Sequence, residues 1–245
     1  MARLSVNLNK IALLRNSRRT GVPDLMAFPK LVRDAGGEGI TIHPRPDERH
    51  IRHSDVAPLA AAIAPWRPAF EYNIEGRPDP TFMALVESVK PEQCTLVPDA
   101  RDAFTSEEGW KLGDAEIAEL KPVIAKLRAI GARVILFVDP DPAIVARVPA
   151  TGAQGVEIYT GSYAEAFRRG DGSALLGKIK GLAEAARDAG LVVNAGHDLN
   201  LNNIPPLMQA VPFLHEASIG HELTADALIS GFSATVAAYA KALKS

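Results

Sequence analysis

The feature that most constrains the fold of this chain is a repeated alternation of short strand-like runs with longer helix-like segments. Each run is rich in β-branched or other apolar residues and is bounded by turn residues, and the segment after it has apolar residues at helical spacing. Strands that alternate with helices predict a parallel sheet, because each helix returns the chain to the edge where the next strand starts. Eight runs occur, at residues 4–10, 39–45, 70–76, 93–99, 133–139, 155–161, 191–197 and 216–221.

The segments between the runs carry signals for where helices begin and end. Asp79 and Pro80 offer an N-cap and a first-turn proline. Pro122 stands inside another segment, where we expect it to kink the helix or to mark the start of its regular part. Glycine closes three segments directly before a run, in DAGGEGITI, AIGARVILF and DAGLVVNAG. Apolar stripes predict helices over 82–89, 117–127, 175–186 and 228–243.

Eight such units predict a (β/α)8 TIM barrel that forms a single domain over residues 1–245. The runs read as near-continuously apolar, which is typical of a parallel sheet covered on both faces. An open, doubly wound sheet is the main alternative. Its Gly-rich dinucleotide-binding loop is not found after the first run, where SVNLNK continues into IALLRN.

The charge balance and the apolar pattern exclude several classes of protein. The formal net charge is -2, which leaves no basic surplus for a nucleic-acid backbone. Residues 1–19 lack the apolar stretch of a signal peptide, and no run of about 18 apolar residues is present for a membrane span. The single cysteine, Cys94, cannot form an intrachain disulfide. We expect a cytoplasmic protein with no nucleic-acid or membrane partner.

Polar residues gather at the predicted carboxyl ends of the strands, where barrels of this kind carry their active sites. Three of the six histidines fall there, namely His43, His197 and His221. Glu75 and Glu157 lie inside apolar runs, where an ionised carboxylate is costly unless an arginine or a ligand needs it. The gathering favours a shared pocket of general acids and bases over separate ion pairs. The other polar residues at strand ends include Asn7, Asn9, Lys10 and Arg45.

Several groups near these ends suit phosphate. Gly220 and His221 open the last predicted helix, where unsatisfied backbone N–H groups at the positive end of the helix dipole attract oxyanions. Arg15, Arg18 and Arg45 offer guanidinium groups for the same purpose. The sequence therefore predicts a barrel that binds phosphorylated small molecules.

Seven motifs anchor a resemblance that covers nearly the whole chain. They are VNLNKIALLRNSR (6–18), DAGGEGITIHPRPDERHI (34–51), NIEG (73–76), LVPD with TSEEGW (96–110), VEIYTG (156–161), VNAGHDLN (193–200) and SIGH (218–221). In this order they resemble the pyridoxine 5'-phosphate synthase family, the ring-closing enzymes of the deoxyxylulose-dependent vitamin B6 pathway.

The resemblance implies a (β/α)8 barrel that condenses 1-deoxy-D-xylulose 5-phosphate with 3-amino-2-oxopropyl phosphate into pyridoxine 5'-phosphate, phosphate and water. It implies no metal or organic cofactor and assembly as a homo-octamer. In catalysis, it implies that His43 and Glu75 accept protons, that His197 donates a proton, and that Glu157 stabilises charged intermediates. The implied ligands of the amino-ketone phosphate are Asn7, Arg18, Asp198, Gly220 and His221. The implied ligands of the deoxyxylulose phosphate are Arg45, His50 and Thr105.

The chain departs from the family pattern at two places. Asn9 and Lys10 stand where many members carry Asp-His, and Asp198 stands where some members have Gly. We include Asn9 and Lys10 among the substrate-binding residues, with Lys10 as a point charge for a phosphate. Residues 100–112 are a candidate lid over the site.

Three other functions stay open at this point. Lys10 is a candidate Schiff-base lysine of an aldolase-like barrel. His43, Glu75, Glu157 and His197 are also a candidate ligand set for a divalent metal in a hydrolase or isomerase. A barrel that binds phosphorylated metabolites as a sensor, without turnover, is the third.

Overall fold

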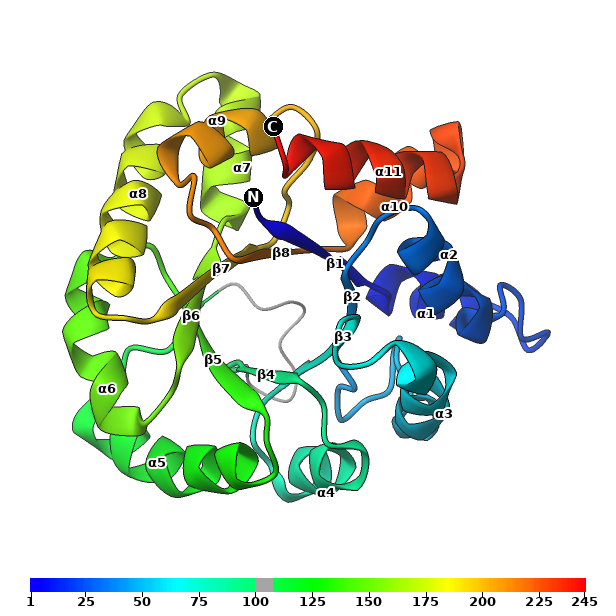
Figure 1. Ribbon diagram of the computed structural model, residues 1–245, viewed down its shortest axis with the longest axis horizontal. Helices are drawn as coiled ribbons and strands as arrows, with labels where there is room; N and C mark the ends of the chain where they lie inside the picture. The colour runs from blue at the N-terminus through cyan, green and yellow to red at the C-terminus, as the bar shows by residue number, and fades with distance from the viewer. Residues whose placement is uncertain (100–107) are drawn as a thin grey trace.

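The computed structural model describes residues 1–99 and 108–245 of the 245-residue chain. Eight parallel strands in this part of the chain pair in sequence order, and the last pairs with the first, so the sheet closes on itself (Figure 1). The predicted (β/α)8 barrel is therefore confirmed. The strands are β1 (Arg3–Asn7), β2 (Gly39–Ile42), β3 (Glu71–Gly76), β4 (Gln93–Leu96), β5 (Arg133–Val138), β6 (Gly155–Tyr159), β7 (Val192–Gly196) and β8 (Glu216–Ile219).

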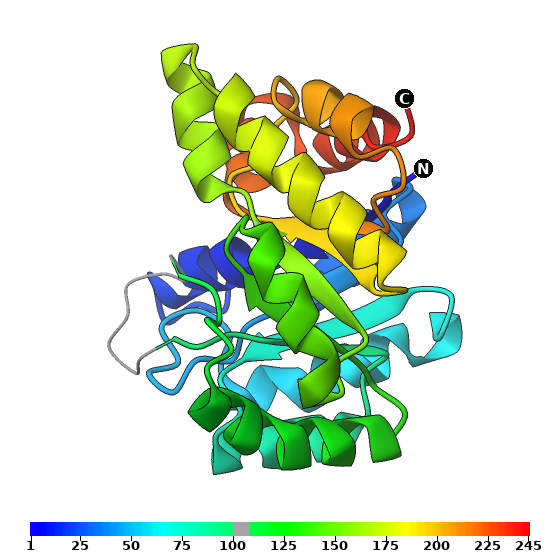
Figure 2. The same ribbon diagram turned by 90° about the vertical axis from the view of Figure 1, so that its left-hand side faces the viewer.

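Helices surround the strands as an outer ring (Figures 1 and 2). None of the helices in the described part of the chain is both long enough and apolar enough to cross a bilayer. Short 3-10 helices cover Leu25–Ala27, Ala64–Trp66 and Pro142–Arg147. The α-helices are α1 (Asn9–Asn16), α2 (Phe28–Asp34), α3 (His53–Ile63), α4 (Pro80–Val89), α5 (Asp114–Ala129), α6 (Val148–Thr151), α7 (Gly161–Arg169), α8 (Ser173–Asp188), α9 (Ile204–Ala210), α10 (His221–Ser230) and α11 (Phe232–Ala242).

The helix boundaries predicted from the Asp79 cap and from the three glycine junctions are confirmed. The side chain of Asp79 accepts a hydrogen bond from the backbone N–H of Phe82 at 2.9 Å, so it caps α4. Gly36, Gly131 and Gly190 end helices with φ angles of 94°, 96° and 74°. In this left-handed region a side chain is strained, which is why glycine stands at these junctions.

Several predicted boundaries are wrong, and the strands β2, β4 and β6 each end two or three residues before the predicted run does. β1 ends at Asn7 and α1 begins at Asn9, so residues 8–10 belong to no strand. α5 already begins at Asp114, so Pro122 does not mark the start of its regular part, and the helix continues through this exposed residue. The stripe over 228–243 is divided between α10 and α11, because Gly231 adopts a φ of 83° between them.

The barrel strands alternate between apolar and polar faces, contrary to the near-continuous apolar pattern read from the sequence. Ile40 and Ile42 of β2 are fully buried in the apolar core, whereas the Thr41 hydroxyl between them bonds to that of Ser5 at 2.7 Å. Gln93 of β4 donates to Glu216 of β8 at 2.8 Å, and this bond must cross the lumen because β4 and β8 lie on opposite sides of the ring. The lumen is therefore a polar core.

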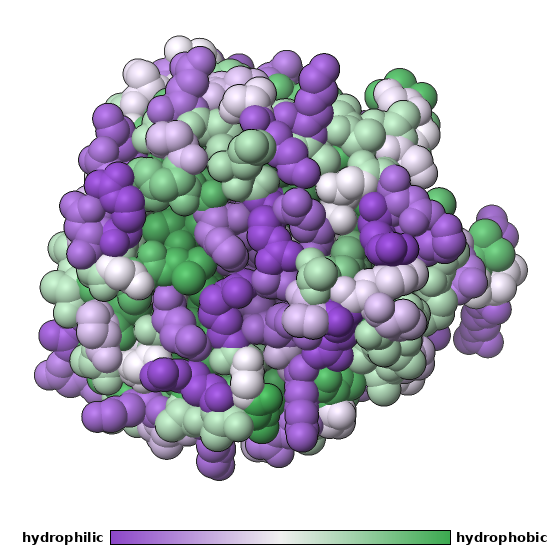
Figure 3. Space-filling model, in the orientation of Figure 1, coloured by the Kyte–Doolittle hydropathy of each residue, from purple (hydrophilic) through white to green (hydrophobic). Residues whose placement is uncertain are grey.

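Ion pairs occupy the end of the lumen where the strands begin. Arg3 and Arg133 both form ion pairs with the buried carboxylate of Glu71. Both chain termini lie on this face of the barrel, and Figure 3 shows hydrophilic side chains gathered at its centre. Glu71, a buried carboxylate with two guanidinium partners, therefore has a structural role in this lumen.

A methyl group on Gly155 of β6 would lie 2.5 Å from the carbonyl oxygen of Val192 on β7, the strand with which β6 pairs. We expect Gly155→Ala to lower the free energy of unfolding by about 1–3 kcal/mol, as overpacking does. Gly177→Ala on the exposed side of α8 is the matched control, because a methyl there meets nothing within 4 Å. It should raise the free energy of unfolding by about 0.5–1 kcal/mol. Urea unfolding measures both changes, and a Gly155→Ala variant as stable as the parent would contradict this packing.

Candidate active site

A cavity of about 460 Å³ lies at the carboxyl ends of the strands. All four predicted catalytic residues line it, so segments far apart in the chain converge there. Of the predicted substrate-binding residues, Arg18 is exposed beyond the end of α1 and does not line the cavity. Thr105 and most of the candidate lid over 100–112 lie outside the described residues. The lining residues are Asn7, Asn9, Lys10, Leu13, His43, Arg45, Arg49, His50, Glu75, Glu157, Tyr159, His197, Asp198, Ser218, Gly220 and His221.

Glu75 projects from β3 into this cavity. Its carboxyl accepts hydrogen bonds from Asn7 Nδ2 at 3.3 Å and from the Ser218 hydroxyl at 3.4 Å. Burial, helped by the negative charge of Asp99, raises the pKa of Glu75 to about 8. The carboxyl is therefore mostly protonated at neutral pH in the empty site, and it is poised to exchange a proton near pH 8.

Glu157 on β6 is the second carboxyl of the cavity and is 2% exposed. Burial and the nearby charge of Glu75 raise its pKa well above the ordinary range. The Thr95 hydroxyl donates to it at 3.4 Å. A methyl group on Gly196 of β7 would lie only 2.2 Å from its Oε1 atom, so glycine at this position makes room for the carboxyl.

Neither cavity glutamate forms an ion pair with a lysine or arginine among the described residues. Arginine pairing is therefore not what holds Glu75 and Glu157 in this part of the structure, in contrast to Glu71 at the other end of the lumen. Two buried carboxyls without a cationic partner create a site that favours a bound cation.

Four histidines line this cavity, namely His43, His50, His197 and His221. Burial first, and then the charge of Arg45, lowers the pKa of His43 well below its ordinary value. The same two causes lower the pKa of His50 to about 4. His50 Nδ1 accepts a hydrogen bond from the Ile51 N–H at 2.9 Å, which places the proton of the neutral ring on Nε2. Both imidazoles are thus neutral near pH 7 and can accept a proton.

His197 enters the cavity directly after β7. Its ring packs against Phe137 and Tyr159, with centroids 5.1 Å and 5.3 Å away. Burial lowers the pKa of His197, although the negative charges of Asp198 and Asp99 oppose this change. His197 and Asp198 adopt φ angles of 82° and 56°, a region that costs a residue with a side chain roughly 1–2 kcal/mol. Strain of this kind persists only where neighbouring groups hold the backbone.

Basic groups and backbone amides line the rim of the cavity. Arg45 is 3% exposed, and its guanidinium pairs with Asp99 at 2.8 Å. Gly220 precedes α10, and a methyl group there would lie 3.0 Å from Asn7 Cβ, so the backbone comes close to β1. The first amides of α10 lie at this edge of the cavity and suit an anion.

Arg15 does not act as the phosphate ligand suggested by the sequence. Its guanidinium donates to both carboxylate oxygens of Asp55, at 2.7 Å and 2.8 Å, and to the His50 carbonyl at 3.2 Å. Arg15 is buried and bound in this way, so it fixes the loop that carries His50.

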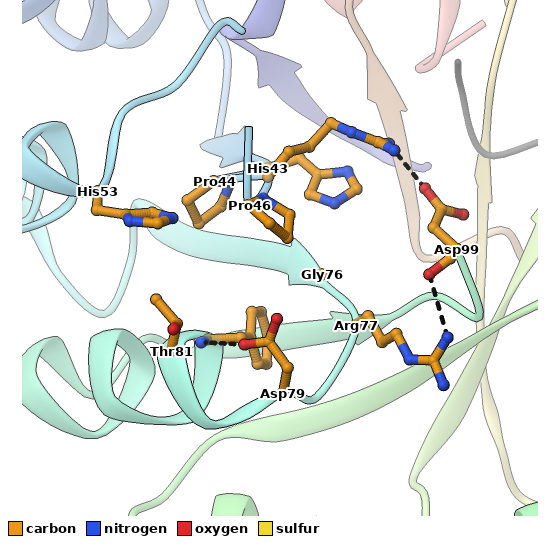
Figure 4. A pocket seen from close by; sticks show the side chains of 11 residues that line it. His43, Pro44, Pro46, His53, Gly76, Arg77, Asp79, Thr81 and Asp99 are labelled. Carbon is orange, nitrogen blue, oxygen red and sulfur yellow. Dashed lines mark hydrogen bonds and ion pairs between the residues drawn. The ribbon is translucent and has the colours of Figure 1, made fainter. Parts of the chain in front are cut away.

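A second cavity of about 520 Å³ adjoins the first and shares His43 and Arg45 with it. Figure 4 shows Asp99 at its edge, where the Asp99 carbonyl also accepts from Arg77 at 3.4 Å. The Arg45–Asp99 pair therefore stands where the two cavities meet.

The sequence alone does not single out Tyr159, Ser218, Arg49 or Asp99, although the first three line the site and Asp99 pairs with a lining arginine. Two of these residues could have been found from the strand periodicity, because residues two positions apart point to the same face of a strand. Tyr159 lies two residues after Glu157, and Ser218 lies two residues before Gly220, on the same face of each strand. Among residues 1–99 and 108–245, no group of three or more His, Cys, Asp or Glu side chains is arranged to hold a metal ion.

Comparisons of the sequence with known proteins identify one family. Residues 4–245 match the family model described as pyridoxal phosphate biosynthesis protein PdxJ. The chain is 49% identical over 247 residues to the pyridoxine 5'-phosphate synthase of Albidiferax ferrireducens, with 98% of this chain and 97% of that protein covered. It is 47% identical over 245 residues to the protein of the same name from Mesorhizobium japonicum, with 98% of each chain covered.

Solved structures similar to this one share its fold at low sequence identity. A tryptophan synthase structure from M. tuberculosis matches with a TM-score of 0.64 and 16% identity, covering 100% of this chain and 93% of that chain. Phosphoribosyl anthranilate isomerase from Thermotoga maritima matches with a TM-score of 0.60 and 12% identity, covering 100% and 99%. At these identities the likeness extends to the barrel alone.

The raised pKa of Glu75, about 8 in the folded chain, makes stability depend on pH. The stability linked to its bound proton is complete below the ordinary pKa near 4.5 and is lost as pH rises through about 8. Glu75→Gln is neutral throughout, so its stability relative to the parent should increase between about pH 5 and pH 8.5, by roughly 1.4 kcal/mol per unit of pKa shift. Urea unfolding at the two pH values measures this change.

The matched control for this prediction is Glu71→Gln, the same substitution on the same strand. It removes the carboxylate that two half-buried guanidinium groups share and should destabilise the chain at pH 7 by about 1–3 kcal/mol. A Glu75→Gln variant whose stability relative to the parent is the same at both pH values would contradict the raised pKa.

Proposed function

The chain belongs to the pyridoxal phosphate biosynthesis protein PdxJ family and is an enzyme of pyridoxine biosynthesis, and we propose that it is a pyridoxine 5'-phosphate synthase. The reaction we propose condenses 1-deoxy-D-xylulose 5-phosphate with 3-amino-2-oxopropyl phosphate to give pyridoxine 5'-phosphate, phosphate and water. Beyond family membership, one observation carries this proposal. Two carboxyls with raised pKa values and two histidines with lowered pKa values, from four different strand ends, face one cavity.

The chemistry of this condensation needs groups that move protons. The substrate amine must form a Schiff base with the other substrate's ketone, phosphate and water must leave, and a carbon–carbon bond must close the ring. His43, neutral near pH 7, suits the role of a proton acceptor. Glu75, with a pKa of about 8, suits the same role once a bound cation favours its ionised form. The lowered pKa of His197 makes its protonated form a stronger acid, which suits the proton donor.

Glu157 suits the stabilisation of a cationic intermediate. It lies beside Glu75, and neither carboxyl has a cationic side-chain partner among the described residues. The substrate ammonium group, and the iminium formed from it, would supply that positive charge. A cation bound there favours the ionised forms of both carboxyls, so substrate binding itself would prepare the bases.

The two phosphate groups require two anion sites. For the amino-ketone phosphate we propose the first amides of α10 at Gly220 and His221, together with Asn7 and Asp198. Arg18 belongs to this group by resemblance and lies exposed outside the cavity in this structure. For the deoxyxylulose phosphate we propose Arg45 and His50 with Thr105, and with Asn9 and Lys10 at the neighbouring rim. We further propose that the enzyme works in the cytoplasm as a homo-octamer without a cofactor.

The assay that tests this function mixes both substrates with the purified protein and follows the formation of pyridoxine 5'-phosphate. We expect turnover by the parent. His43→Ala and Glu75→Ala should each lower kcat by at least about a hundredfold, the lower range for removal of a general acid or base. His53→Ala is the matched control, because His53 does not line the catalytic cavity and should leave kcat unchanged. No product from the parent, or full activity in both variants, would refute the proposal.

Lys10 lines the cavity, so the aldolase-like alternative has a specific test. Borohydride added with a ketose phosphate should label no lysine, because in the proposed reaction the amine comes from the substrate. Lys10→Met should mainly raise the KM for the deoxyxylulose phosphate, since it removes a point charge rather than the nucleophile. Mass-spectrometric detection of a reduced adduct on Lys10 would instead support the aldolase-like mechanism.

A further inference from the structure

His197 reaches the cavity only because the backbone after β7 leaves its extended path. Gly196 faces the lumen, since a methyl group on it would meet the Glu157 carboxyl. In an extended strand the next side chain would point to the opposite face, toward the helices. The φ of 82° at His197 turns the imidazole back to the lumen side, against Phe137 and Tyr159.

Side chains from two other segments hold this turn. The backbone N–H of Thr160 donates to the Gly196 carbonyl at 2.9 Å. The Thr160 hydroxyl lies 2.5 Å from the same carbonyl and 2.6 Å from the His197 carbonyl, so its one proton is shared between them. Thr160 is the N-cap residue of α7, yet its hydroxyl does not cap that helix. Its polar groups are directed at the turn that follows β7.

The next carbonyl is held by an amide. Asn203 Nδ2 donates to the Asp198 carbonyl at 3.0 Å, and Asn203 Oδ1 accepts from the Asn200 N–H at 2.7 Å. Both Thr160 and Asn203 are fully buried, and the Tyr163 hydroxyl of α7 donates to the Asn203 carbonyl at 2.9 Å. Three successive carbonyls, those of residues 196–198, are thus bonded to two buried side chains.

We propose that Thr160 and Asn203 are positioning residues for the reaction, which hold residues 197 and 198 in the left-handed conformation that aims the His197 imidazole into the cavity. This inference rests on the proposed role of His197 as proton donor. Neither residue lines the catalytic cavity, so both act through the backbone of the turn. Without the shared hydroxyl proton the turn can relax, and small errors in the position of a catalytic group are costly to rate.

The test compares Thr160→Val, which removes the hydroxyl at nearly constant shape, with Thr160→Ser, which keeps it. Thr151→Val is the matched control, because Thr151 is also fully buried and donates to a carbonyl, that of Val148 at 2.7 Å, far from the cavity. We expect Thr160→Val to lower kcat at least about tenfold with KM changed less than about threefold, and Thr160→Ser to restore most of kcat. Thr151→Val should lose stability without losing kcat.

A second readout does not depend on turnover. Nuclear magnetic resonance of the histidine rings should show the His197 signals shifted in Thr160→Val and in Asn203→Asp, and unshifted in Thr151→Val. If Thr160→Val does not fold, Asn203→Asp and Thr160→Ser carry the same comparison. Normal kcat and unshifted His197 signals in the folded variants would overturn the inference, as would a Thr160→Ser variant as impaired as Thr160→Val. A parent that makes no product refutes the proposed function, and the ring signals still decide whether the turn is held in this way.

Discussion

The structure depends on how a closed barrel accommodates carboxylates in its lumen. Every second residue of each strand points inward, so a glutamate placed there is buried and needs a partner. At the end where the strands begin, Glu71 has two arginines. At the carboxyl end, Glu75 and Glu157 have only hydroxyl and amide partners among the described residues. One end of the same lumen is therefore salt-bridged, and the other carries the two carboxyls with raised pKa values that we propose as part of the active site.

This asymmetry links several features that would otherwise be unrelated. Burial raises the pKa values of the two carboxyls, and burial, followed by the charge of Arg45 in the loop after β2, lowers those of His43 and His50. Protonated carboxyls and neutral imidazoles then line one cavity, an arrangement that suits proton transfer near neutral pH. The left-handed turn at His197 brings into the same cavity an imidazole that an extended strand would direct away from the lumen.

Much of the fold and part of the candidate site could be predicted from the sequence, and the predictions that are wrong have physical causes. The eight strands and the glycine junctions follow from local patterns, as does the gathering of His43 and His197 at strand ends. The sequence pattern does not predict the polar lumen, because the Ser, Thr and Asn residues that alternate with apolar ones are small and interrupt the apolar runs only weakly. The Arg15–Asp55 pair joins residues 40 positions apart, and no local pattern reveals such a contact. The break at Gly231 was missed because periodicity continues across a change in helix direction.

The central claim is that the Glu75 carboxyl carries a proton near neutral pH because its desolvation is not offset by a cationic side chain among the described residues. Infrared difference spectroscopy of the parent against Glu75→Gln, titrated with pH, observes that proton directly. We predict a protonated-carboxyl band assigned to Glu75 that persists at pH 7 and disappears with a midpoint near its pKa of about 8. A carboxyl already ionised at about pH 5, as an exposed glutamate would be, would contradict the claim.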